Sequence, residues 1–364
     1  METINPMRIL FISYGNYEFD GRLRELFAVV SKLGETFLFS RGASPISRNH
    51  TIINKSYSKF IFSSIKYGKK IGDIDVLFLD NRKSIIPGLR LKKFYKNAKI
   101  ILDCRELYLS KYVRNFTSKI GCYIEKKGIK KSDAIICANK ERSSFMKKYY
   151  HLTRDPIVFE NYRKLEFTSV EAMNASLEKF KSFNIDAEYR IVSTAGCDIS
   201  RLTDILVKNM SNVVGKSRLF LVGNSTQKEI EIIEKICKEN NIDNITILGS
   251  LKQDDLKALL SYCHIGIVSY HQKDFNNIYC ASGKIFEFLE EKMPVVTTTN
   301  PPLKSFCDET NVGECSDVFY DAINKVISSY DYYKSNVESF CSNNKYRNSA
   351  EVFYSDLCTY LKQI

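Results

Sequence analysis

Short apolar runs alternate with amphipathic helical patterns along most of the 364 residues. In the first half, the apolar runs predict strands at 8–13, 35–40, 75–80, 98–103 and 134–138. Helical spacing of apolar residues predicts helices at 20–33, 59–70, 107–127 and 140–150 between them. Apolar strands that alternate with helices are typical of a parallel sheet covered by helices. The pattern therefore predicts an α/β domain.

The same alternation continues in the second half. Strands are predicted at 189–195, 217–223, 244–248, 264–269 and 294–298, and helices at 201–210, 226–239, 252–262 and 283–291. The polar segment 162–188 has no strand pattern and reads as a linker that is helical around 172–183. Because a chain of 364 residues is too long for a single hydrophobic core of typical size, we predict two successive doubly wound, Rossmann-like domains.

Charge separates the two halves. Residues 1–165 carry 33 Lys and Arg against 15 Asp and Glu, which gives +18, whereas residues 166–364 carry 21 against 27, which gives −6. The segments 55–70 and 111–131 mix Lys with Phe, Ile and Tyr, which suits helices lying on an anionic membrane surface. For either segment alone, a core helix with a basic outer face is an alternative. Nucleic acid could use the same charge, but no recognised binding module appears.

Several classes of protein are excluded by what the chain lacks. No apolar stretch approaches the roughly 18 residues of a membrane span, and the N-terminus does not resemble a signal peptide, so we expect a cytosolic protein. The eleven cysteines include no C-x-x-C pair and are expected to be reduced. The four histidines have no metal-ligand spacing. No G-x-G-x-x-G follows the first strand, so a nicotinamide or flavin cofactor is not expected.

The segment 276–298 is the most informative one. It predicts a loop, an amphipathic helix and a buried strand, with Lys284 and Glu287 three positions apart on the first turn of the helix. Lys284 at a helix start suits a phosphate, and Glu287 could accept hydrogen bonds from ribose hydroxyls. The spacing indicates a nucleotide-diphosphate pocket; an ordinary surface helix is the alternative. A P-loop is excluded, because Gly283-Lys284 lacks the upstream Gly and the following Ser or Thr.

These residues resemble the donor-site signature of family-four retaining glycosyltransferases. The matching groups are Ser282-Gly283-Lys284, Glu287-Phe288-Leu289 and the strand that follows Lys292. Two positions depart from that signature: Tyr279 stands where many members have a Glu, and Lys292 replaces a Gly, so Lys292 would bear the strain of a left-handed helix cap.

The resemblance implies the GT-B architecture, in which two Rossmann-like domains face a cleft. Residues 1–165 would bind the acceptor and residues 166–345 the nucleotide sugar. A terminal helix at about 346–363 would cross back to the first domain, so that 346–364 belong with it.

On the donor side, the resemblance extends to Gly196, Arg201 and the strand-end Gly223. It implies that Arg201 and Lys284 neutralise the diphosphate and hold it as charge develops on the leaving group. Asn277 lies in the loop that would shape the pocket. The alternative for Arg201 is a surface Arg paired with a neighbouring carboxylate.

On the acceptor side, Gly15 and the pair Asp20 and Arg22 match the loop and the start of the first helix of the family. The segment 102–108, with Asp103, Arg105 and Glu106, resembles a motif at the mouth of the cleft in which a His is usual at position 105. The permanently charged Arg105 suits an anionic group instead. The alternative for Asp103 and Glu106 is helix capping and first-turn dipole compensation.

The resemblance implies a retaining, metal-independent hexosyltransferase, and no cofactor is expected. It would move a sugar from a nucleotide diphosphate sugar to a lipid-linked saccharide in the synthesis of a surface polysaccharide such as capsule or O-antigen, at the inner face of the cell membrane. A nucleotide-sugar epimerase and a non-catalytic nucleotide- or glycan-binding protein are the alternatives. Asp73 and Asp75 match the metal-binding motif of another glycosyltransferase class, but their position before a strand favours a simple turn.

Overall fold

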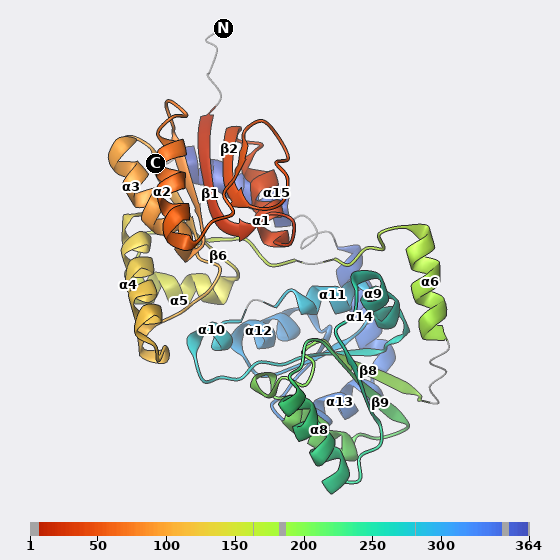
Figure 1. Cartoon of the computed structure of the whole chain (residues 1–364). Helices are drawn as coiled ribbons and strands as arrows, with labels where there is room; N and C mark the ends of the chain where they lie inside the picture. Colours follow the sequence, from red (N-terminus) through yellow and green to blue (C-terminus); the bar gives the residue numbers. More distant parts are fainter. Residues whose placement is uncertain (1–6, 163, 182–186, 281, 344–348, 363–364) are drawn as a thin grey trace. The chain divides into compact units, whose positions relative to one another are not determined.

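The computed structural model describes residues 7–162, 164–181, 187–280, 282–343 and 349–362 (Figure 1). The chain forms two compact units. Unit 1 comprises Met1–Asn161 together with Arg347–Ile364, and unit 2 comprises Tyr162–Tyr346. The division after Asn161 lies close to the boundary predicted after residue 165.

Unit 1 is built on a seven-stranded sheet with the order β3-β2-β1-β4-β5-β6-β7, in which every pairing is parallel. Its strands are β1 (Met7–Asn16), β2 (Gly34–Arg41), β3 (His50–Ile52), β4 (Val76–Asp80), β5 (Lys99–Asp103), β6 (Ala134–Cys137) and β7 (Ile157–Val158). The predicted strands are all present, and all five residues of β4 are buried, as expected for a central parallel strand.

The helices of unit 1 lie on both faces of this sheet. They are α1 (Gly21–Val30), α2 (Tyr57–Gly68), α3 (Ile85–Phe94), α4 (Phe116–Lys131), α5 (Lys140–Tyr150) and α15 (Ser349–Lys362), with the short 3-10 helices η1 (Arg82–Ser84) and η2 (Ser110–Tyr112). One core contains alternate residues of the central strands, such as Ile9, Phe11 and Phe78, packed with α1 and α15. On the other face α2, α3 and α4 lie side by side (Figure 1).

The terminal helix α15 belongs to unit 1, although it follows unit 2 in the chain. It packs against α1 and β7, and Phe353 and Leu357 are completely buried in the core of unit 1. The predicted return of the terminal helix to the first domain is thereby confirmed. The first residues of the predicted helix, 346–348, lie outside the described residues.

Unit 2 contains a six-stranded parallel sheet with the order β10-β9-β8-β11-β12-β13. Its strands are β8 (Tyr189–Ser193), β9 (Ser217–Val222), β10 (Ile245–Gly249), β11 (Ile265–Val268), β12 (Val295–Thr297) and β13 (Gly313–Cys315). Its helices are α6 (Val170–Lys181), α7 (Thr203–Asn209), α8 (Gln227–Glu239), α9 (Gln253–Tyr262), α10 (Phe275–Ile278), α11 (Lys284–Glu290), α12 (Pro301–Thr310), α13 (Phe319–Ser328) and α14 (Tyr330–Ser342), with η3 (Ile199–Arg201) and η4 (Met210–Asn212).

The main error in the predicted elements concerns the helix placed at 107–127. The chain instead runs through a loop and η2, and α4 begins at Phe116. Asn115 sets this start, because its side chain accepts a hydrogen bond from the Ser118 amide at 2.7 Å. Helix α3 was not predicted, since Pro87 and Gly88 interrupt its pattern; Pro87 is tolerated in the first turn, and Gly88 packs against Leu79.

Two smaller expectations are also settled. Lys292 has a φ of +61°, so the predicted left-handed strain at this position is confirmed. All eleven cysteines are free and eight of them are buried. Among the described residues, no helix has both the length and the apolar character needed to cross a membrane.

Candidate functional site

In each sheet the strand order reverses next to the first strand of the unit. This point lies between β1 and β4 in unit 1 and between β8 and β11 in unit 2. Ligands of open parallel sheets bind outside the carboxyl ends of the strands at such a switch point. The carboxyl ends of these strands are therefore the candidate sites of the two units.

In unit 2, Lys284 connects α11 to the end of β8. Its Nζ donates a hydrogen bond to the carbonyl oxygen of Thr194, the residue directly after the strand. The apolar residues Ile285, Phe286, Phe288 and Leu289 anchor α11 in the core of the unit. The ammonium group is thus held beside the switch point by a buried helix.

Arg201 approaches the same strand ends from η3. Its carbonyl accepts a hydrogen bond from Ser269 Oγ at 2.6 Å, and its guanidinium lies 4.0 Å from the ring centre of Tyr270. Ser269 and Tyr270 directly follow β11. The next residue, Leu202, has a φ of +61°, a strained conformation for a side chain of this kind. Arg201 is paired with an aromatic ring, and no carboxylate among the described residues forms the ion pair considered from the sequence.

Four buried polar atoms around this point have no hydrogen-bond partner within the described part of the chain. They are Ser193 Oγ, Thr194 Oγ1, Arg201 Nη1 and Ser282 Oγ. Buried polar groups are nearly always paired, by protein, water or ligand. Ser193 ends β8, Thr194 holds Lys284, and Ser282 lies two residues before Lys284, so these atoms come from segments that meet at the switch point. Their unused capacity suits a polar ligand.

The loops after β8 and β9 pack backbone against backbone. Gly196 has a φ of +64°, and its amide donates to the Val222 carbonyl at 2.8 Å. A Cβ at Gly196 would lie 2.7 Å from Ser225 Oγ, and one at Gly223, whose φ is +137°, would lie 2.9 Å from the Gly196 nitrogen. Both positions therefore require glycine. The packing of the two loops explains why both residues are glycines. Because the loops lie so close together, they carry no side chain at these two positions beside the strand ends.

The remaining predicted donor residues have defined places in unit 2. Glu287 lies on the first turn of α11 with 6% of its surface exposed. Gly283 precedes α11 with an ordinary helical φ of −68°. Asn277 belongs to the short helix α10, where its carbonyl accepts from the buried Asn300 at 2.8 Å. Tyr279 directly follows α10, and its ring lies 6.0 Å from that of Phe275.

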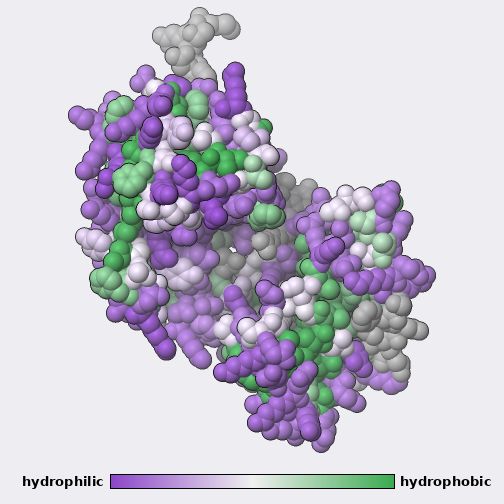
Figure 2. Space-filling model, in the orientation of Figure 1, coloured by the Kyte–Doolittle hydropathy of each residue, from purple (hydrophilic) through white to green (hydrophobic). Residues whose placement is uncertain are grey.

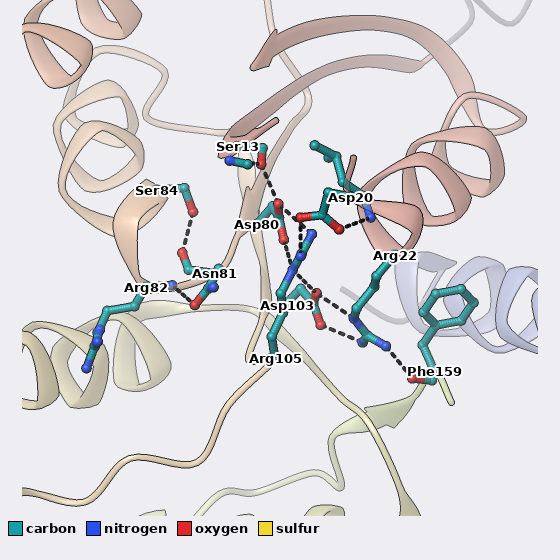
Figure 3. A network of polar contacts seen from close by, with 12 residues as sticks. Ser13, Asp20, Arg22, Asp80, Asn81, Arg82, Ser84, Asp103, Arg105 and Phe159 are labelled. Atoms are coloured by element: carbon teal, nitrogen blue, oxygen red, sulfur yellow. Dashed lines mark hydrogen bonds and ion pairs between the residues drawn. The ribbon is translucent and has the colours of Figure 1, made fainter. Parts of the chain in front are cut away.

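In unit 1, Asp103 ends β5 and is completely buried. Arg22 donates to both of its carboxylate oxygens, at 2.8 and 3.1 Å, and a third donor of Arg22 reaches the Phe159 carbonyl at 2.8 Å (Figure 3). Because Asp103 lies in a strand and no helix follows it directly, the alternative of helix capping is wrong for this residue.

Arg105 lies among three carboxylates. It donates to both oxygens of Asp80, at 2.6 and 2.9 Å, and to Asp20 at 2.5 Å, and its Nε is 3.5 Å from Asp103 (Figure 3). Asp20 also caps α1 through the Leu23 amide at 3.0 Å. The carboxylates therefore occupy the donors of Arg105 that the sequence suggests for an anionic ligand, and Arg105 holds Asp20 and Asp80 instead.

Asp80 is the residue that sequence reasoning missed. It ends β4 with 2% of its surface exposed, and Ser13 Oγ donates to it at 2.5 Å. Burial raises the pKa of the Asp80 carboxyl, against the opposing effect of Arg105. The next residue, Asn81, has a φ of +66° and a ψ of 169°, a conformation almost restricted to glycine.

The other predicted residues of unit 1 lie near this cluster. The Gly15 amide donates to Ser13 Oγ at 2.9 Å, and a Cβ on Gly15 would lie 2.9 Å from Asp20 Oδ2. Glu106 is half-buried in the loop after β5. It lies ten residues before the start of α4 and is not part of a helix. First-turn dipole compensation is therefore wrong for Glu106 as well.

No group of three or more His, Cys, Asp or Glu side chains suited to a metal ion occurs within the described ranges. Asp75 precedes β4, where its carboxylate accepts from the Arg8 amide at 2.8 Å. Asp75 thus lies at the amino end of the sheet, away from the switch point, which confirms the interpretation as a turn.

Comparison with known proteins gives a structural likeness only. No protein-family model and no curated protein matches the sequence. Sucrose-phosphate synthase from Thermosynechococcus elongatus superimposes with a TM-score of 0.69 at 16% identity, over 98% of both chains. Anabaena HepE in complex with UDP and glucose gives 0.72 at 12%, over 98% of this chain and 100% of that one. A glycosyltransferase from Rickettsia africae gives 0.71 at 15%, over 98% of both chains. The chain has the GT-B fold of these proteins.

Proposed function

We propose that the protein is a glycosyltransferase that uses a nucleotide diphosphate sugar. The observation that carries this proposal is the meeting of Arg201, Lys284 and unpartnered buried hydroxyl groups at the switch point of unit 2. Two cations and several neutral donors match the charge and the hydrogen-bonding needs of a diphosphate with sugars on either side. The likeness to HepE, whose structure contains UDP and glucose, supports the same assignment.

Each donor residue has a defined role in this proposal. Arg201 and Lys284 bind the diphosphate and stabilise the charge that develops on it as the sugar leaves. Glu287 accepts hydrogen bonds from the ribose, and Gly196 and Gly223 allow the backbone to approach the ligand. Ser282, Gly283 and Asn277 shape the pocket around the transferred sugar. We further propose retention of configuration without a metal ion, on the basis of the sequence resemblance.

The acceptor is proposed to bind at the strand ends of unit 1. Asp103 and Arg22 form a bidentate pair, and Arg22 also donates to the Phe159 carbonyl, so we assign them to holding the loop after β5 in place. Asp20 and Arg105 keep 21% and 16% of their side-chain surfaces exposed and are the members of the cluster that a saccharide could contact. We propose a lipid-linked saccharide of surface polysaccharide synthesis, which places the enzyme at the inner face of the membrane.

Ligand-induced stabilisation tests the donor assignment first. The melting temperature is measured with UDP, GDP and ADP and with their sugar conjugates, because a ligand that binds the native state raises its stability. At least one nucleoside diphosphate is expected to raise the melting temperature in proportion to the logarithm of its concentration. No shift with any of them would contradict the proposal.

Transfer itself is tested with the radiolabelled sugar nucleotide that gives the largest shift. Label is expected to enter the organic phase only when lipid extract is present, and to do so in excess EDTA. An isomerised sugar nucleotide without transfer would indicate the epimerase, and binding without turnover would indicate a non-catalytic protein. Loss of activity in EDTA that Mg²⁺ restores would contradict metal independence.

A further inference from the structure

The outer surface formed by α2, α3 and α4 has an unusual charge distribution. The three helices carry ten cationic side chains, namely Lys59, Lys66, Arg90, Lys92, Lys93, Lys119, Lys126, Lys127, Lys130 and Lys131. Their only carboxylate, Glu125, is 3% exposed and faces inward. In the described part of the chain, none of the ten cations forms an ion pair. This surface therefore presents positive charge alone.

The helices form one continuous layer because small residues let them approach closely. A Cβ on Gly68 of α2 would lie 2.9 Å from the Leu91 side chain of α3, and one on Gly128 of α4 would lie 2.8 Å from Ile85 of α3. The exposed cations of the three helices thus belong to a single surface of unit 1; Lys92 is the exception, because its ammonium donates to the carbonyls of Lys96 and Ala98. Extended basic surfaces raise the local concentration of anionic partners.

Large apolar side chains also point outward from this layer. On α4 the exposed fractions are 76% for Phe116, 43% for Ile120 and 68% for Tyr123, and this spacing places the three on one stripe of the helix. Phe62 of α2 and Phe94 of α3 are 68% and 53% exposed. In Figure 2, green apolar residues interrupt the purple hydrophilic surface along this side of unit 1. Single exposed apolar residues are common, but a set on neighbouring helices marks an interaction site.

We propose that the outer face of α2, α3 and α4 docks on an anionic lipid bilayer. Lysine side chains that extend past exposed aromatic residues can reach lipid phosphates while the rings enter the interfacial region. Along α4 the exposed stripe is apolar in its first two turns and basic in its last two, so the two kinds of contact are separated along the helix. This assignment rests on the proposed function for its purpose, which is to bring the enzyme to a lipid-linked acceptor.

The test is co-sedimentation of the whole protein with vesicles of phosphatidylglycerol and phosphatidylcholine, or of phosphatidylcholine alone. Binding is expected only with the anionic vesicles and is expected to fall as salt rises, because screening shortens the Debye length to about 3 Å at 1 M. The triple variant Lys126→Glu, Lys127→Glu and Lys130→Glu should reduce the partition coefficient by at least tenfold.

A matched control keeps the net charge equal. Lys228, Lys235 and Lys238 are exposed on α8 of unit 2, and their reversal to Glu changes the total charge by the same amount. This triple variant on α8 should bind vesicles like the wild type. Equal loss in both triple variants would mean that only the overall charge matters, and would overturn the proposal.

A second variant tests the apolar contribution. Phe116→Ser with Tyr123→Ser removes exposed rings without touching a core residue, and it should weaken binding to anionic vesicles even at low salt. Wild-type binding by this variant would overturn the apolar contact. If the protein ignores both kinds of vesicle but binds single-stranded RNA, the surface serves a polynucleotide instead. The nucleotide-induced melting shift, measured on the same samples, reports separately on the donor site.

Discussion

Arg105 and Asp80 form a bidentate ion pair at the carboxyl end of the unit 1 sheet, with Nε and Nη2 each donating to one carboxylate oxygen. Asp80 is buried, so removal of the guanidinium would leave its carboxylate without a charged partner. Arg105→Met is expected to lower the free energy of unfolding by about 3–5 kcal/mol. Urea denaturation measures this loss.

Two further variants define the origin of that loss. Lys148→Met removes an exposed cation of α5 and should leave the unfolding midpoint unchanged. Asp80→Asn combined with Arg105→Met should recover part of the lost stability, because no buried charge remains unpaired. If Arg105→Met alone is as stable as the wild type, the pair does not hold this end of the sheet together.

Glu287→Ala is expected to weaken binding of a nucleoside diphosphate by roughly 1–3 kcal/mol, because hydrogen bonds to the ribose are lost. Glu287→Gln should keep part of the affinity, since the amide oxygen still accepts one hydrogen bond. Isothermal titration calorimetry with the nucleotide selected by melting shift provides the measurement. Unchanged affinity in a folded Glu287→Ala protein would remove Glu287 from the site.

Arg201→Met should reduce affinity for a nucleoside diphosphate more than for the corresponding nucleoside, because the guanidinium is assigned to the phosphates. Charge-assisted hydrogen bonds of this kind contribute about 1.5–3 kcal/mol. Lys208→Met, an exposed position on the neighbouring helix α7, is the matched control. An equal loss for nucleoside and diphosphate would show that Arg201 only supports the fold around Tyr270.

We expect the free energy of unfolding to depend on pH because of the buried carboxyl of Glu125. Burial raises the pKa of its carboxyl to about 8 from an ordinary value of 4.5, with Arg82 opposing and Glu106 adding to the shift. Between these two values the folded state holds a proton that the unfolded state has released. The stability that the protonated Glu125 carboxyl gives to the folded state is therefore lost as the pH rises from 4.5 to 8.

Glu125→Gln removes that titration. The melting temperature of the variant minus that of the wild type is expected to increase from pH 5 to pH 8 and to level off above it. Glu351→Gln, at an exposed position of α15, should show no such trend. A difference that stays constant across this range would mean that Glu125 does not titrate there.

The sequence predicted the central strands well because buried parallel strands are continuous apolar runs, as in VLFLD of β4. It did not predict β3, β7 or β13, which have only two or three residues and too short a pattern. Helix α4 was placed too early, since the start depends on a single side-chain cap at Asn115. The spacing of apolar residues does not reveal such a cap.

The site was predicted unevenly for a related reason. Lys284 and Glu287 could be singled out because they lie three positions apart, and Arg201 because it follows Gly196 closely; their roles in donor binding stay predictions. Asp80 could not be found in that way, because its role depends on the parallel register that places it beside Asp103 across β4 and β5. A signal was nevertheless present: both strands end in Leu-Asp, and neighbouring parallel strands bring such ends together.

The position of α15 has a consequence for how the chain matures during synthesis. Phe353 and Leu357 complete the core of unit 1, yet the ribosome makes them only after all of unit 2. Unit 2 is continuous in sequence and can close its core first. Unit 1, although it begins to emerge earlier, leaves the part of its core next to α1 and β7 uncovered until α15 is made. Nascent chains stalled between the two units would therefore expose apolar surface, which makes such species prone to aggregation.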